Sequence, residues 1–562
     1  MHEMNPQLKS RLRGIGAALA ILIAGLAQAA APGITAAPPL GGAANGSTFN
    51  LDAAASYITQ PDGASIYSWG YGCANGNDAA NQASFAPAAI TNTFCTTMQI
   101  PGPTLIVTQG DTVTITLTNK LPGAAGNTSI LFPGFQVKTS GGVTGLLTQE
   151  AVTGGSVTYT FVADKAGTHS YYSGTQGDLQ VEMGLYGALI VLPAKATPTG
   201  FVALPNGLPS AYTAPAWPGL GHPDSCTAVG AKLPRVKPDP DFRLASAAYD
   251  NPSACYDREY LFQLSEMDPA IHSQAEAQKG ILCQAPTGCM VVKTEPYHPA
   301  YFLVNGRSMP DDMDPNYATQ YPHQPYNGNP HMHPGELALL RIIGQGRLQH
   351  PLHEHANHVR VLGRDGNLIL TANNDGRLAG PLMFTTSSTP GQALDGIFQY
   401  TGKGLNWDMY AHLSDDTTAA SGAGALCVPD AEGYYTTASG APSTAPNYYE
   451  WCADHKKPLE SKPFGNVGAG GPVTLPDANI LANGNWYGGS PYFGPDATAR
   501  AVGTTPIPPF GTIANDPGSE AGFAYMWHSH NEREITTNNI FPGGMMMMML
   551  VDPWVYSINE AN

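Results

Sequence analysis

Residues 103–119, PTLIVTQGDTVTITLTN, decide the fold class of this chain. Apolar residues alternate with others from Leu105 to Val107 and again from Val113 to Leu117. Alternation with a period of two is typical of strands with one buried face. Gly110-Asp111 between the two runs suits a tight turn, because both residues tolerate turn conformations. The stretch therefore predicts a strand, a turn and a second strand.

The rest of the chain repeats this pattern. Only 12% of its 562 residues are charged, while 64 are Gly and 49 are Pro, a composition typical of many short strands joined by turns. A chain of this length exceeds one hydrophobic core, so we expect several domains in an all-β protein. Further strands are predicted within residues 157–161, 184–192, 260–264, 301–304, 337–343, 358–362, 391–400 and 523–530.

The N-terminal residues resemble a processing signal. Lys9, Arg11 and Arg13 precede an apolar run over residues 15–26, and Ala27-Gln28-Ala29 provides a small-residue cleavage site. A membrane-spanning helix is the alternative, but the run is shorter than the roughly 20 residues that a bilayer requires. We therefore predict a signal peptide over residues 1–29 and a secreted protein, periplasmic or extracellular.

The net charge bears on the kind of binding partner, and the cysteine content bears on disulfide formation. The net charge is −17, and removing residues 1–29 leaves −19, which argues against nucleic acid as a partner. The sequence contains no second long apolar segment, so we predict no integral membrane span. All eight cysteines follow the cleavage site, and export favours disulfides. Pairing of neighbours is one of about 105 connectivities: 73 with 95, 226 with 255, 283 with 289, and 427 with 452.

Composition also divides the chain. Residues 30–48 are mostly Ala, Gly and Pro, so we expect a flexible leader there. We expect a first domain over 49–195, a Pro-rich linker over 196–255, and a second domain over 256–556 that carries an insertion at about 414–520.

Histidines are the residues most informative about chemistry. Among the 16 histidines, His350, His353 and His355 form one group, and His528 and His530 another. On a strand, residues i and i+2 point to the same face, so each H-x-H pair can offer two imidazoles to one site. Imidazole binds copper, zinc and iron, and affinity peaks at copper. The alternative is that such pairs are half-exposed polar strand residues without a ligand role.

Four segments carry a family resemblance: PGPTLIVTQGDTVTITLTNKLP (101–122), GLYGALIVLP (184–193), HPLHEH (350–355) and WHSHNE (527–532). They resemble the cupredoxin domains of the multicopper oxidase family, in a divergent bacterial member. The resemblance implies tandem cupredoxin-like Greek-key β-sandwiches. Because the second half holds one domain opening and one close, it favours two sandwiches over three.

The resemblance also implies copper as cofactor and assigns ligands. The family uses a type 1 copper and a three-copper cluster. His350 matches a type 1 ligand, His353 the type 2 ligand, and His355, His528 and His530 match type 3 ligands.

Other ligand positions depart from the family pattern. Ser529 stands where the type 1 cysteine is expected, and Glu534 stands at the second type 1 histidine. A blue copper centre needs the thiolate, which serine cannot replace. In the first domain, Leu131-Phe132-Pro133-Gly134 and Tyr172-Ser173-Gly174 replace the histidine motifs. Four of the eight cluster ligands are therefore missing, and the type 1 site is expected to be absent.

Two functions remain open at this stage. One is a copper-dependent oxidoreductase with a reduced site, whose partners would be oxygen and a small-molecule or metal-ion reductant. The other is a non-catalytic cupredoxin scaffold that binds metal or the cell envelope. Two-domain members of the family often form trimers, so a trimer is one possible assembly.

Two neighbouring features are given structural interpretations. Glu354 points away from its histidine neighbours on a strand, which predicts a solvated position. Met545 to Met549 could supply thioether ligands, but a terminal buried strand explains the run more simply.

Overall fold

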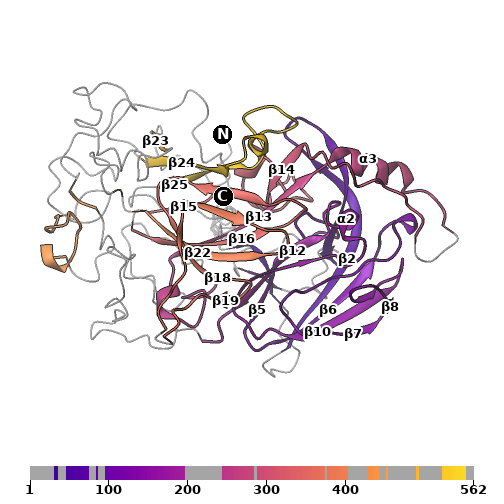
Figure 1. Cartoon of the computed structure of the whole chain (residues 1–562), viewed down its shortest axis with the longest axis horizontal. Helices are drawn as coiled ribbons and strands as arrows, with labels where there is room; N and C mark the ends of the chain where they lie inside the picture. Colours follow the sequence, from indigo (N-terminus) through magenta and orange to yellow (C-terminus); the bar gives the residue numbers. More distant parts are fainter. Residues whose placement is uncertain are drawn as a thin grey trace, which may run out of the picture.

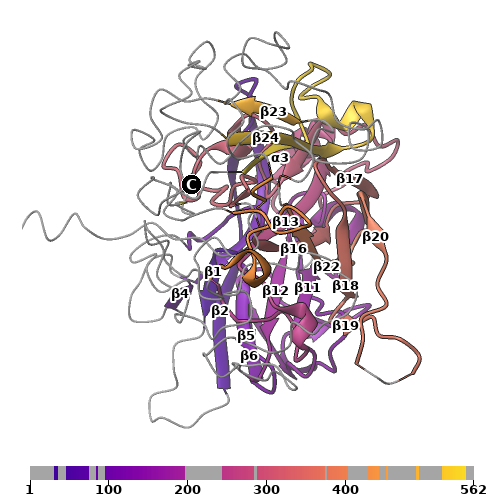
Figure 2. The ribbon, with the colours of Figure 1, turned by 90° about the vertical axis from the view of Figure 1, so that its left-hand side faces the viewer.

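The molecule contains two β-sandwiches, side by side in both views (Figures 1 and 2). The prediction of an all-β protein with two tandem β-sandwiches is confirmed. The computed structural model describes residues 31–35, 46–74, 84–86, 95–195, 243–283, 288–333, 335–373, 376–400, 402, 428–441, 451–453, 489–492, 522–551 and 558.

The first sandwich pairs two five-stranded sheets, ordered β11-β12-β5-β1-β4 and β3-β2-β6-β10-β7. Its core lies between them and includes Trp69, Ile115 and Leu189, all fully buried. A short ribbon of β8 and β9 flanks the sheets. The strands are β1 (Gly33–Thr35), β2 (Gly46–Thr59), β3 (Ser65–Cys73), β4 (Ser84–Ala86), β5 (Leu105–Thr108), β6 (Thr112–Asn119), β7 (Lys138–Gly141), β8 (Val143–Thr144), β9 (Gln149–Glu150), β10 (Ser156–Val162), β11 (Gly167–Tyr172) and β12 (Tyr186–Leu192).

The turn at Gly110-Asp111 connects the two sheets of this sandwich. β5 pairs with β12 in one sheet, whereas β6 pairs with β2 and β10 in the other. Gly110 has a φ of +98°, which favours glycine, and the Asp111 carboxylate accepts a 3.0 Å hydrogen bond from the Thr108 amide. The predicted strand, turn and strand are therefore present. The two strands do not pair as a hairpin, because the turn leads from one sheet of the sandwich to the other.

The second sandwich pairs a seven-stranded sheet, β14-β13-β16-β22-β18-β19 with β20 beside β18, and a six-stranded sheet, β15-β25-β24-β17-β21 with β23 beside β24. Trp527, Tyr525 and Leu340 lie in its core. The strands are β13 (Arg258–Met267), β14 (Tyr301–Val304), β15 (His331–Met332), β16 (Leu337–Gly344), β17 (His350–Glu354), β18 (Val359–Arg364), β19 (Asn367–Leu368), β20 (Leu382–Met383), β21 (Thr385–Ser388), β22 (Ala393–Gln399), β23 (Gly489–Tyr492), β24 (Gly522–Ser529) and β25 (Met546–Val551).

Helices are few and short among the described residues. The longest, α3 (Pro269–Gln278), starts at Asp268, whose side chain accepts a hydrogen bond from the Ala270 amide as an N-cap. Ile271 and Ala275 of α3 are buried in the core of the first sandwich. The remaining helices are α2 (Gly177–Gln180), η1 (Gly123–Ala125), η4 (Pro252–Ala254), η5 (Asp311–Met313), η6 (Thr437–Ser439) and η8 (Glu532–Ile535).

A buried charged network joins the two sandwiches. Asp395 of β22 accepts hydrogen bonds from the backbone and hydroxyl of Thr168 in β11, at 3.0 and 2.5 Å. Arg341 of β16 lies 2.8 Å from Glu259 and 3.5 Å from Asp395. All four side chains are at most 3% exposed. Because each buried charge has a partner, this network fixes how the first sandwich sits against the second.

Two segments predicted to lack structure are partly ordered. Within the predicted leader, Gly33–Thr35 forms β1, because Ile34 packs into the core and pairs with Leu105. At the end of the predicted linker, Tyr249 is buried, and its hydroxyl donates a 2.6 Å hydrogen bond to Asp395. Ile34 and Tyr249 thus extend the buried part of the protein into segments whose composition alone predicts no strand.

Several predictions fall on residues outside the described ranges, including the signal peptide and most of the insertion. Two predicted disulfides are present, Cys73–Cys95 and Cys283–Cys289. Cys255 and Cys452 are also disulfide-bonded, while Cys226 and Cys427, their predicted partners, lie outside the described residues. Within the described part of the chain, no helix is both long and apolar enough to span a bilayer.

We predict that the Cys73–Cys95 disulfide stabilises the first sandwich more than Cys283–Cys289 stabilises its own loop. The bridged residues are 22 and 6 positions apart. Chain entropy then predicts losses of about 3 kcal/mol for C73A/C95A and about 2 kcal/mol for C283A/C289A. Urea unfolding followed by tryptophan fluorescence measures both, since Trp69 is buried in this core. An equal or larger loss for the shorter loop would contradict the prediction.

Candidate metal centre

The candidate site is built on two neighbouring strands, β17 and β24. They pair antiparallel, with His353 directly opposite His528 and Leu352 opposite Ser529. Directly opposed residues share a face of the sheet, and alternate residues along each strand face opposite sides. Consequently the register places both H-x-H pairs on the outer face and Ser529 on the inner face, toward the core.

The four imidazoles of His353, His355, His528 and His530 gather on this outer face. The ring centroid of His353 lies 4.6 Å from that of His355, 5.6 Å from His528 and 4.9 Å from His530. The Nε2 atoms of His355 and His528 are 3.1 Å apart. His353 and His355 are buried, His528 is half-buried and His530 is exposed. The cluster therefore has a buried floor and an open side.

Neighbouring groups orient two of these rings. The Nδ1 of His528 lies 2.7 Å from the carbonyl oxygen of Ser529, which can only accept, so Nδ1 carries the proton and Nε2 carries the lone pair in the neutral ring. The Nδ1 of His353 lies 2.8 Å from the Thr385 hydroxyl. Hydrogen bonds to the remote nitrogen are how metal-binding histidines are commonly held.

The protonation of the cluster suits ligation. Burial, together with the neighbouring His528 and His530, lowers the pKa of His353 to about 4. Burial also lowers the pKa of His528, and His530 adds to that effect. Neutral imidazole is the form that binds a metal ion, so no proton has to leave these two rings near neutral pH.

The spacing of the nitrogens is compatible with copper held by imidazoles. His355 and His528 form a 3.1 Å hydrogen bond between their Nε2 atoms. Two nitrogens that bind one ion at the length of a zinc–imidazole bond, about 2.0–2.1 Å, lie roughly as far apart. Among the described residues, no three His, Cys, Asp or Glu donors are already arranged as a metal site. The other two rings would therefore have to rotate to reach the same ion.

His350, also predicted as a ligand, lies on the inner face of β17. Its Nδ1 is 2.9 Å from Glu534 and its Nε2 is 2.8 Å from Glu266, and all three side chains are buried. Ser529 donates a hydrogen bond to the same oxygen of Glu534, and Asn531 donates to its other oxygen at 2.9 Å. The three positions that resemble type 1 copper ligands thus meet as an ion-pair network.

This network does not fit a type 1 copper. Burial by itself lowers the pKa of His350, but hydrogen bonds to Glu266 and Glu534 and their charges outweigh it and raise the pKa to about 9. The ring is therefore a cation at neutral pH with both nitrogens donating, and it has no lone pair for a metal. Ser529 offers no thiolate. The assignment of His350 as a metal ligand is not supported by this geometry.

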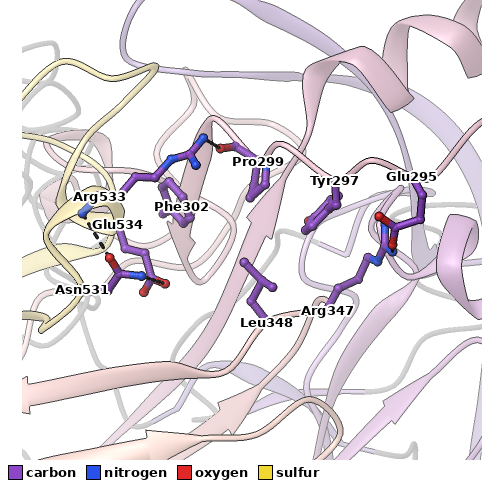
Figure 3. Close-up of a pocket in the computed structure, with 9 residues that line it drawn as sticks. All are labelled: Glu295, Tyr297, Pro299, Phe302, Arg347, Leu348, Asn531, Arg533 and Glu534. Carbon is purple, nitrogen blue, oxygen red and sulfur yellow. Dashed lines mark hydrogen bonds and ion pairs between the residues drawn. The ribbon is translucent and has the colours of Figure 1, made fainter.

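A cavity of about 400 Å³ opens beside the network, with Glu534 among its lining residues (Figure 3). Arg347 lies over the Tyr297 ring, 4.2 Å from its centroid, and Arg533 donates a 3.1 Å hydrogen bond to the Pro299 carbonyl. A small molecule in this cavity would meet paired charges, because Glu534 is already bonded to His350.

The predicted solvated position of Glu354 is wrong. Its side chain does point away from the histidine rings, but it is 1% exposed and accepts a 2.6 Å hydrogen bond from Thr386. Burial raises the pKa of Glu354 to about 8. The inner face of β17 packs against the seven-stranded sheet of the same sandwich. Because side chains alternate along the strand, the Glu354 carboxyl lies in the core, where it is largely protonated at neutral pH.

The first sandwich fills the positions of its missing ligands with apolar packing. Leu131 and Tyr172 form a backbone bridge, and Phe132 packs with its ring centroid 5.0 Å from that of Phe161. A Cβ added at Gly174 would fall within 2.7 Å of the Leu131 side chain. The positions where the resemblance expected histidines therefore carry no imidazole.

Some residues of the site were not predicted from the sequence. Glu266 and Thr385 lie on β13 and β21, far along the chain from the histidines that they bond. Neither belongs to a motif, and only the pairing of β17 with β21 brings Thr385 to His353.

Part of the chain is similar to known proteins. A multicopper oxidase family model matches residues 79–196. A multicopper oxidase from Talaromyces pinophilus is 37% identical over 111 residues, 19% of this chain and 18% of that protein. An L-ascorbate oxidase from Brassica rapa subsp. pekinensis is 42% identical over 100 residues, 17% of each. The chain thus matches less than a fifth of these relatives' length.

The chain also aligns with solved structures over most of its length. The blue copper oxidase from Nitrosomonas europaea aligns over 89% of this chain and 85% of its own, with a TM-score of 0.40 and 14% identity. The multicopper oxidase mgLAC aligns over 91% and 86%, also with a TM-score of 0.40 and 14% identity. The histidine cluster lies outside the residues that the family model matches.

We predict that replacing His350 with Gln destabilises the protein by about 3–5 kcal/mol, because Glu266 and Glu534 lose their buried cation. The folded-state pKa of about 9 exceeds the ordinary value of 6.5, so this stabilisation is complete below about pH 6.5 and is lost as pH rises through 9. Thermal unfolding between pH 6 and 10 should show this loss for wild type and not for H350Q. H358Q, at a half-buried histidine, is the control; identical pH profiles for all three proteins would refute the prediction.

We also predict that S529C alone creates no intense copper–thiolate absorption band. The new thiol would face Glu534 and a protonated His350 in place of two neutral imidazoles. Visible absorption of the copper-treated variant tests this, with wild type as the control. A strong band in S529C would show that the ion-pair network opens readily to a metal.

Proposed function

We propose that the protein is a secreted copper-binding oxidoreductase of the multicopper oxidase family with a reduced copper site; the match of a multicopper oxidase family model to residues 79–196 supports the family. The site consists of His353, His355, His528 and His530, without a type 1 copper. One observation carries the proposal: the four rings, from stretches 173 residues apart, lie with centroids 4.6–5.8 Å from their neighbours.

Each residue has a distinct part in this proposal. His353 and His355 form the buried floor of the site, and their positions are held by the pairing of β17 with β21 and β24. His528 is held by its bond to the Ser529 carbonyl, which directs Nε2 toward His355. His530 is exposed and leaves one side open to small molecules. Copper bound here would supply one-electron exchange between Cu(II) and Cu(I).

The absence of a type 1 centre determines how a substrate would react. In this chain the inner face holds an ion pair, so an electron cannot enter through a thiolate at position 529. A reductant would therefore have to approach the outer-face histidines directly. Phe384, 54% exposed and with its ring centroid 5.7 Å from His353, provides an apolar rim at that approach.

The central test is copper content. We predict that purified wild type binds copper and that H353A/H528A loses it, because one ring is removed from each pair that forms the cluster. H358A is the matched control, since its ring also contacts Phe384 but is not one of the four. Elemental mass spectrometry measures the copper content. Unchanged copper in H353A/H528A would defeat the proposal for this site.

Turnover is tested separately by oxygen uptake. Copper-loaded wild type, offered a phenol or a reducing metal ion, should consume oxygen, and H353A/H528A should not. Copper binding without oxygen uptake would instead support a protein that holds copper on a non-catalytic cupredoxin scaffold.

A further inference from the structure

The outer face that carries the four histidines continues onto β25. β24 pairs antiparallel with β25, and His528 stands directly opposite Met546. Because His353 stands opposite His528 on the other side, a single row of side chains crosses three strands as His353, His528 and Met546. Directly opposed residues share a face, with Cβ atoms about 4.5–5.5 Å apart. Met546 is therefore an immediate neighbour of the histidine cluster.

A second row lies beside the first. Met526 precedes His528 by two residues on β24 and so shares its face, and Met548 stands opposite Met526 on β25. Met526 and Met548 are half-buried, and Met546 is 4% exposed. Three thioethers thus border the imidazoles of one sheet face.

The other methionines of the run have a different environment. Met545, Met547 and Met549 are at most 1% exposed and pack in the core between the two sheets with Trp527. The run over residues 545–549 is therefore divided by strand alternation. The predicted buried strand accounts for the core-facing members. Of the outer-face members, Met548 packs beside Ala524 and Leu550, and Met546 stands opposite His528.

Thioether ligands are expected to favour Cu(I) over Cu(II). Thioether sulfur is a soft ligand that prefers Cu(I), whereas imidazole binds several ions, Cu(II) among them. We propose that Met526, Met546 and Met548 extend the histidine cluster into a mixed imidazole–thioether site that binds Cu(I). The inference rests on the proposed copper-binding function and deepens it: the same sheet face holds copper in its reduced state as well as in its oxidised state.

The strand itself supplies a matched pair of variants. M546L/M548L removes two outer-face thioethers, and M547L/M549L removes two core-facing ones from the same strand. Leucine and methionine have similar volumes, so such replacements usually cost less than about 1.5 kcal/mol each. Full-length protein is titrated anaerobically with Cu(I) in competition with a chromogenic Cu(I) chelator, and separately with Cu(II). Ag(I) serves as a redox-inert probe of the soft ligands.

We expect M546L/M548L to weaken Cu(I) and Ag(I) binding by at least about tenfold, equivalent to about 1.4 kcal/mol. Cu(II) binding should stay within about twofold, because the imidazoles remain. M547L/M549L should bind both copper ions as wild type does. X-ray absorption of the Cu(I)-loaded wild type should show sulfur neighbours that M546L/M548L loses. If M546L/M548L does not fold, as judged by near-UV circular dichroism, M526L provides the same comparison from β24.

Three results would overturn the inference. They are unchanged Cu(I) binding in M546L/M548L, an equal loss in M547L/M549L, and a Cu(I) site without sulfur neighbours. If Cu(II) binding meanwhile depends on His353 and His528, the proposed function stands and only the role of the thioethers fails. If wild type binds neither Cu(I) nor Cu(II), the proposed function and this inference fail together.

Discussion

The alternation of side chains along β17 and β24 is the constraint on which the rest of the site depends. Because the two strands are paired with His353 opposite His528, the outer face receives His353, His355, His528 and His530. The inner face receives the residues between them, including Ser529. A shift of β24 by one residue would turn His528 toward the core and Ser529 and Trp527 to the outer face. One set of backbone hydrogen bonds therefore separates two chemically different environments.

The inner environment holds a structural ion pair at the positions that resemble type 1 copper ligands. An imidazole that lies between two carboxylates is held as a cation, and this is the opposite of what a metal ligand requires. His350 between Glu266 and Glu534 is in this condition, and Ser529 supports it by donating to Glu534. On the outer face, burial and the neighbouring His528 and His530 lower the pKa of His353 to about 4, and burial also lowers the pKa of His528. The protein thus places a charged core network and a cluster that includes neutral imidazoles on opposite faces of the same sheet.

The two sandwiches contribute unequally to this chemistry. The family model matches residues 79–196, which include strands β4 to β12 of the first sandwich. Yet Leu131 and Tyr172, two of the positions where the resemblance expected histidines there, form a backbone bridge with each other. The histidine cluster belongs to the second sandwich, which that match does not reach. The first sandwich is joined to the second through Asp395 and Arg341, which lie on the seven-stranded sheet and not on the six-stranded sheet that carries the histidines.

Local pattern was sufficient for the fold class and for the four outer histidines. Strands such as Leu337–Gly344 and Tyr301–Val304 are visible as apolar runs, and an H-x-H pair on a strand places two rings on one face by geometry alone. Other features depended on pairing between distant segments, which a local pattern does not contain. The burial of Glu354, the capture of His350 by Glu266, and the position of Met546 beside His528 each follow from which strand lies next to which. Sequence alone therefore determined the faces of the strands, and only tertiary structure decided what each face meets, because sheet register joins residues that are far apart in the chain.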